Sequence, residues 1–123
     1  MHVFIAEVCS GLDAERLRPF RDALRSCGAA VVNDPHSPEA FVLPWTEAAT
    51  VASHIQGLAL GAWKDRQRTG RPQLYWLPAC SAPIPAGYRF YADAAIHLPG
   101  EFAEAARLIC NSDNSGAPVQ PPK

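Results

Sequence analysis

Apolar residues along the chain fall into two kinds of stretch, short continuous runs and longer segments with helical spacing. The short runs are rich in β-branched and aromatic residues and predict buried strands over 2–8, 29–34, 41–45, 72–80 and 93–98. In the longer segments apolar side chains recur every third or fourth position, which predicts helices over 12–27, 54–69 and 100–110. This alternation is typical of an α/β domain in which a mostly parallel sheet lies between two layers of helices.

The lengths of the connections between the predicted elements limit the possible strand orders. Only PHSPEA, residues 35–40, separates the second predicted strand from the third, whereas a parallel crossover normally takes a dozen residues or more. We therefore expect a flavodoxin-like, three-layer fold with a sheet of about five strands in the order 2-1-3-4-5, whose second crossover helix is short or missing. Residues 1–110 are expected to form one domain, and 111–123, which lack periodicity, a disordered tail or linker.

Some predicted elements contain residues that disfavour them. Pro19 lies inside the first helical stretch, so we expect a kink or a later helix start there. Gly57 and Gly61 lie inside the second helical stretch and indicate that this helix closely approaches either the sheet or a ligand. The proline-rich segment SAPIPAGYRFYA, residues 81–92, is expected to form a long loop that is functional or mobile.

Composition excludes several classes of partner. The 123 residues carry 11 basic and 12 acidic side chains, for a net charge of −1, which provides no attraction to nucleic acid or to an anionic membrane. No apolar stretch approaches the ~20 residues that cross a bilayer. The four cysteines form no C-x-x-C pair and follow no secretory signal. We expect a soluble cytoplasmic protein with reduced thiols and no metal site.

Polar and aromatic residues follow the predicted strands at the point where ligands bind in such sheets, beyond the carboxyl ends and at the switch point between the first and third strands. Glu7 and Ser10 come after the first strand, Asp34 ends the second, and Trp45 and Glu47 lie at the end of the third. Carboxylates beside an aromatic wall suit a nucleotide base and its ribose hydroxyls, although the same residues would equally form an ordinary polar rim. The chain has no glycine-rich phosphate-binding loop.

The segment VFIAEV, followed by LDAERLRPFRDALRSCGAAVVND, resembles the opening of Toll/interleukin-1 receptor-like (TIR-like) domains, notably a bacterial subgroup that begins V-F-[IL]-A-E-V. GRPQLYWLP resembles the fourth strand of this family and EFAEAARLI its last helix. The resemblance covers residues 2–110 and is best over 3–34. It implies a flavodoxin-like fold and either assembly with other TIR-like domains in bacterial defence or signalling, or cleavage of NAD at the nicotinamide glycosidic bond.

The resemblance also bears on catalysis. Enzymatic members place a glutamate on the helix before the fourth strand, often beside an aromatic residue, and here that neighbourhood reads GAWKDRQ. The aromatic position matches Trp63, but the carboxylate position holds Lys64 or Arg66, and Asp65 is rotated by ~100° around the helix from its neighbour. The catalytic residues are therefore unassigned. The candidate carboxylates are Glu7, Glu47 and Asp65, and the candidate ligand-binding residues are Glu7, Ser10, Asp34, Trp45 and Trp63.

Two functions are therefore expected as alternatives. The first is a TIR-like signalling or interaction module, degenerate for catalysis, that assembles with its own kind or with other TIR-like domains and needs no cofactor. The second is an enzyme that acts on an N-glycosidic bond. It would be either an NAD glycohydrolase, for which NAD is a substrate, or an enzyme similar to the nucleoside 2-deoxyribosyltransferases, which use a glutamate nucleophile in an equivalent crevice. A third hypothesis is that the protein binds a nucleotide without consuming it.

Overall fold

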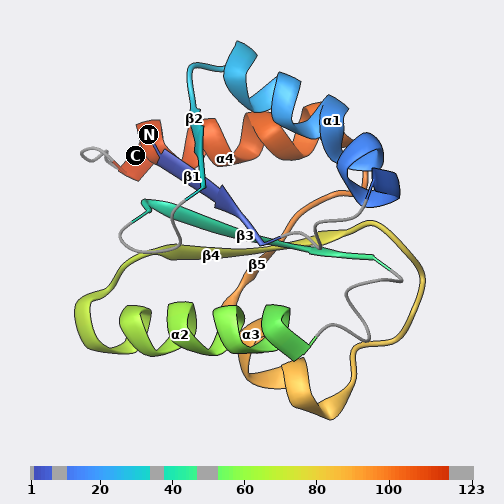
Figure 1. Ribbon diagram of the computed structural model, residues 1–123. Coiled ribbons are helices and arrows are strands. Elements are labelled where there is room, and N and C mark those ends of the chain that lie inside the picture. Colours follow the sequence, from blue (N-terminus) through green and yellow to red (C-terminus); the bar gives the residue numbers. More distant parts are fainter. Residues whose placement is uncertain (1, 7–10, 34–37, 47–52, 117–123) are drawn as a thin grey trace.

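The computed structural model describes residues 2–6, 11–33, 38–46 and 53–116, and within these ranges five parallel strands form one sheet with helices on both faces (Figure 1). The strand order is β2-β1-β3-β4-β5, which confirms the predicted flavodoxin-like class. The strands are β1 (His2–Ile5), β2 (Ala30–Val32), β3 (Ala40–Trp45), β4 (Gln73–Pro78) and β5 (Ile96–His97). The helices are α1 (Gly11–Ser26), α2 (Ser53–Thr69), the short 3-10 helix η2 (Ala86–Tyr88), α3 (Arg89–Ala94) and α4 (Phe102–Gly116).

The central strand β3 is buried along its whole length, as expected for a parallel strand covered on both faces. It pairs with β1 only as far as Ile5↔Val42, but with β4 along all six residues. Pro44 lies in the part of β3 beyond the paired residues of β1, and a proline in a strand is tolerated where no ladder donor is required.

Alternating side chains divide the core into two layers. One, here the α1–α4 layer, contains Val3, Val42 and Leu77 packed against α1 and α4, whose Phe20 and Phe102 rings lie 5.9 Å apart. The other, the α2–α3 layer, contains aromatic side chains from the opposite faces of the same strands and lies against α2 and α3 (Figure 1). The aromatic residues buried in it are Phe4, Phe41, Trp45, Trp76, Tyr88 and Tyr91.

Several predicted boundaries are corrected. Helix α1 begins at Gly11 and continues through Pro19, so the expected later start is wrong. The expected loop over 81–92 is wrong for its second half, because η2 and α3 occupy 86–94 and bury Tyr88 and Tyr91. Helix α4 continues to Gly116, beyond the predicted end at residue 110. Between β2 and β3 the described residues, 33 and 38–39, form no helix, in line with the short second crossover.

The close approach predicted at Gly57 and Gly61 is not found, since a Cβ atom at either would meet no described atom within 4 Å beyond the helix itself.

We expect Gly61→Ala to raise the free energy of unfolding by about 1 kcal/mol, because alanine removes the entropic penalty of glycine in a helix. Chemical denaturation measures this. The control is Gly28→Ala at a φ of +93°, where the added Cβ is strained and the change should be destabilising. An unchanged or lower stability of Gly61→Ala would contradict the open space at this position.

Candidate functional site

A pocket of about 330 Å³ lies at the corner of the sheet where the edge strand β2 ends. Its size is at the lower end of the range typical of small-molecule sites. We refer to it as the carboxyl-edge pocket. Its described lining comes from β1 and β2, from α1 on one face of the sheet and from α2 on the other: Phe4, Ile5, Arg21, Val31, Val32, Asn33, His54 and Leu58.

Strand pairing and connection length together account for the described surroundings of this corner. Phe4 belongs to the α2–α3 layer and Val32 packs against its margin. In a sheet of this order, a crossover helix between β2 and β3 would cover these side chains, but the described part of that connection forms none. Leu58 of α2 packs against the same layer from the next helix along.

Three polar side chains line the pocket, and they arrive from three different elements. Arg21 comes from the middle of α1, Asn33 directly follows β2, and His54 lies in the first turn of α2. Burial lowers the pKa of Arg21, the nearby Arg25 lowers it further, and Asp22 acts in the opposite direction. No aspartate or glutamate is among the described lining residues, so the described surface of the pocket is apolar and basic.

Four of the predicted site residues, Glu7, Ser10, Asp34 and Glu47, lie outside the described residues, so their roles stay predictions. Each is close in sequence to a described residue at the carboxyl end of a strand. Ala6 follows β1, Asn33 follows β2, and Thr46, which is 1% exposed, follows β3.

Trp45 is buried in the α2–α3 layer. Its side chain is 1% exposed, and its indole N–H donates a hydrogen bond to the Ala82 carbonyl oxygen at 3.1 Å. Its ring centroid lies 5.0 Å from that of Trp76 and 4.9 Å from that of Tyr88. In this arrangement the ring is a core element, and it is not among the described residues that line the carboxyl-edge pocket.

Trp63 is half-buried on α2 and faces the neighbouring helix α3. Its ring packs edge-on against Phe90, with centroids 5.5 Å apart and an interplanar angle of 77°. Trp63 therefore helps to hold α3 against α2 and does not line the carboxyl-edge pocket.

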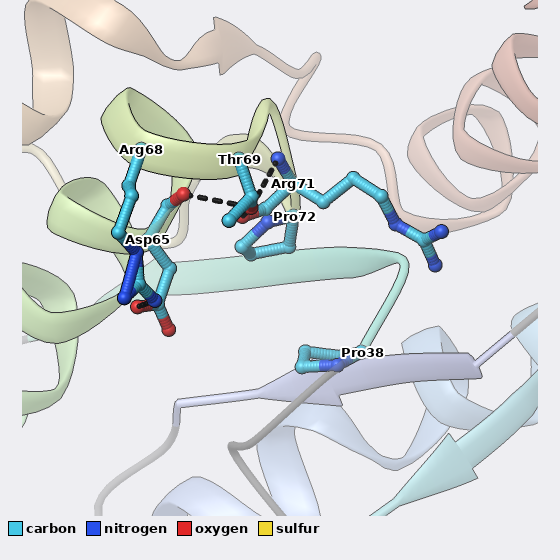
Figure 2. A pocket seen from close by; sticks show the side chains of 6 residues that line it. All are labelled: Pro38, Asp65, Arg68, Thr69, Arg71 and Pro72. Carbon is cyan, nitrogen blue, oxygen red and sulfur yellow. Dashed lines mark hydrogen bonds and ion pairs between the residues drawn. The ribbon is translucent and has the colours of Figure 1, made fainter.

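Asp65 lies at the opposite edge of the sheet. Helix α2 begins after the carboxyl end of β3 and runs back to the amino end of β4, which brings Asp65 into a second pocket of about 340 Å³ beside Pro38 and Pro72 (Figure 2). Asp65 forms an ion pair with Arg68 at 2.9 Å, while the Arg71 side chain extends away from both (Figure 2). The structure thus places Asp65 at the amino edge of the sheet, away from the carboxyl ends of the strands, where Glu7 and Glu47 are predicted to lie.

Another carboxylate at the amino edge has a structural role. Glu39 precedes β3 and accepts a hydrogen bond from the backbone N–H of His2, and this bond is the main reason that the pKa of Glu39 is lowered. The bond ties the first residue of β1 to the start of β3.

The sequence patterns missed Arg21, His54 and Leu58 as site residues. Helical periodicity identifies a buried face, here Leu17, Phe20 and Leu24 on α1, but it does not tell which flanking residue borders a gap. The signal that pointed to the gap was the short connection over 35–40. Read together with the strand order, it agrees with the described part of the β2–β3 connection, which places no helix over the corner formed by β1 and β2.

Within the described ranges, no three His, Cys, Asp or Glu side chains lie close enough together to hold a metal ion, and no helix is long and apolar enough to cross a membrane. Comparison of the chain with models of protein families, with curated proteins and with solved structures finds no match, so the TIR-like resemblance stays a prediction.

Proposed function

We propose that this chain is a TIR-like signalling or interaction module that works by assembling with TIR-like domains, its own copies included. The proposal rests on the resemblance of its opening residues to that family and on the 2-1-3-4-5 parallel sheet that the family would require. The observation that favours this module over an enzyme that uses Asp65 is the position of Asp65 at the amino edge of the sheet.

That position matters because cleavage of a glycosidic bond needs a carboxylate held against the reacting carbon. With a rise of 1.5 Å per residue, Asp65 lies roughly 16 Å along α2 from His54, which lines the carboxyl-edge pocket. A side chain reaches only a few ångströms, so Asp65 is too far away to act on a ligand in that pocket. Its described partner is Arg68, with which it forms an ion pair at 2.9 Å on the surface of α2.

The test combines turnover with assembly. We expect the purified chain incubated with NAD to release no nicotinamide above a heat-denatured control, as measured by liquid chromatography. We expect size-exclusion chromatography with light scattering to give a mass that rises with protein concentration. Nicotinamide release that depends on the folded chain, or a monomeric mass at every concentration, would contradict the proposed homotypic module.

One observation favours the enzymatic alternative, cleavage of NAD or of another N-glycosidic bond. The carboxyl-edge pocket is lined by β1, which precedes Glu7 in sequence, and by the first turn of α2, which follows Glu47, and it is large enough for part of a nucleotide. An enzyme of this kind should lose turnover in Glu7→Gln or Glu47→Gln and keep it in Asp65→Asn. Loss of turnover in Asp65→Asn would instead contradict a site at the carboxyl edge.

A further inference from the structure

We propose that copies of this chain assemble head to tail, with the exposed face of α2 in one copy packed antiparallel against the exposed face of α4 in the next. The proposal rests on the homotypic assembly proposed above and names the two surfaces that form the contact. The α2 face is defined by Leu60 and Lys64, and the α4 face by Glu104 and Leu108.

Each face carries a large apolar side chain that the fold leaves exposed. Leu60 is 39% exposed and Leu108 is 40% exposed, and in the described ranges the other large apolar side chain with such exposure is Ile96 at the sheet edge. The opposite sides of the two helices are buried in the core, through Ala59 on α2 and Ile109 on α4. Burial of apolar surface is the main favourable contribution to association, so a contact between the two leucines would be stabilising.

Charged residues at matching positions set the direction of the contact. Lys64 follows Leu60 by four residues, about 6 Å along the helix axis and on the same face. Glu104 precedes Leu108 by the same four residues. An antiparallel crossing that sets the two leucines opposite each other therefore brings Lys64 opposite Glu104, whereas a parallel crossing would place these two charges at opposite ends of the contact.

The surrounding charges are compatible with a pair between Lys64 and Glu104. Glu104 accepts a hydrogen bond from Arg107 of its own helix, and a carboxylate can accept further donors. Asp65, next to Lys64, pairs with Arg68. Glu104 lies in the first turn of α4, and Lys64 lies in the second half of α2. An antiparallel contact therefore also brings the partly negative carboxyl end of α2 toward the partly positive amino end of α4.

The positions of the two helices in the fold determine the form of the assembly. Helices α2 and α4 cover opposite faces of the sheet (Figure 1), so a copy that contacts one neighbour through α2 still presents α4 to another. A heterologous contact of this kind repeats along a line and does not close into a two-fold dimer. We therefore expect the mass to keep rising with protein concentration beyond that of a dimer.

Mixtures of two variants test the contact on the full chain by size-exclusion chromatography with light scattering. Leu60→Asp and Leu108→Asp each place a charge in the contact and should weaken self-association about tenfold or more. An equimolar mixture of the two retains one intact α2 face and one intact α4 face, so it should form a dimer and nothing larger. Ile96→Asp changes an equally exposed apolar position outside both faces and should assemble like the wild type. Thermal melts establish that each variant is folded.

Charge reversal tests the pairing of Lys64 with Glu104. Lys64→Glu and Glu104→Lys should each weaken assembly, the double variant should restore it, and higher salt should weaken assembly of the wild type. A wild-type chain that is monomeric at every concentration overturns the proposed function, and this contact with it. The contact alone is overturned if the wild type assembles and Leu60→Asp or Leu108→Asp assembles equally well, if their mixture gives no dimer, or if the double charge reversal restores nothing.

Discussion

Replacing Trp45 by alanine is expected to lower the free energy of unfolding by about 3–5 kcal/mol, the range for truncating a large buried aromatic side chain. Trp45 ranks among the largest fully buried side chains of the described core and contacts rings from β4 and η2. Its removal creates a cavity in the α2–α3 layer and deletes the hydrogen bond to Ala82. Urea denaturation followed by far-UV circular dichroism measures the loss.

Trp45→Phe is the matched control for this substitution. Phenylalanine keeps an aromatic ring in the layer but loses the indole N–H, so the expected cost is smaller, on the order of 1 kcal/mol. A Trp45→Ala variant that unfolds at the wild-type urea midpoint would contradict the buried position of the ring. Such a result would instead support the position beside a ligand that the sequence predicts for Trp45.

Replacing Tyr91 by alanine is expected to cost a similar amount, about 3–5 kcal/mol. Tyr91 is fully buried on α3, where its hydroxyl lies 3.0 Å from the Phe41 carbonyl oxygen and 2.9 Å from that of Tyr75. The phenol thereby links α3 to β3 and β4 at once. Tyr91→Phe keeps the ring and removes only the hydroxyl, so it should cost on the order of 1 kcal/mol. Equal stability of the wild type and Tyr91→Ala would show that α3 is not anchored by this side chain.

The same hydroxyl predicts a dependence of stability on alkaline pH. Burial raises the pKa of Tyr91 well above its usual range, so the folded protein keeps the phenol neutral while the unfolded chain ionises it near pH 10. The folded state then binds more protons than the unfolded state, and stability falls as the pH rises through about 10. Tyr91→Phe should remove this part of the decline, measured as unfolding free energy between pH 8 and about 11. If the unfolding free energy of Tyr91→Phe falls equally steeply with pH, the decline is caused by other titrating groups.

The parallel sheet was predictable because short apolar runs and long amphipathic stretches have different periods and different lengths. FVLPW and PQLYWLP are nearly continuous apolar segments, and such short runs favour strands covered on both sides. The strand order followed from the handedness and the lengths of connections, with the short segment 35–40 excluding an ordinary second crossover helix.

The segment over 86–94 was not predictable from its pattern. The prolines at 83 and 85 just before it and its glycine at 87 are typical of a loop, and α3 has only six residues, too few to show helical periodicity. Its structure depends on tertiary contacts, in which Tyr88 packs on Trp45, Phe90 on Trp63, and Tyr91 between β3 and β4. Contacts between distant parts of the chain override weak local preferences here.

A pocket lies at the carboxyl edge of the sheet, where the candidate site was predicted, but its described lining comes from β1, β2, α1 and α2 and includes none of the predicted site residues. Strand order places ligands beyond the carboxyl ends, and the carboxyl-edge pocket lies there. Asp65 was a candidate carboxylate because it lies close in sequence to Trp63, and α2 places it at the amino edge. Position along a helix determines which edge of the sheet a residue reaches, and the family motif alone does not encode it.

The division of the core into two layers affects what can be observed spectroscopically. All three tryptophans of the chain, Trp45, Trp63 and Trp76, belong to or pack against the α2–α3 layer. Tryptophan emission therefore reports on one side of the sheet, whereas far-UV circular dichroism reports on the helices of both. If the α1–α4 layer opened by itself, the emission would barely change while helical signal was lost, and only the comparison of the two signals would reveal the partly open state.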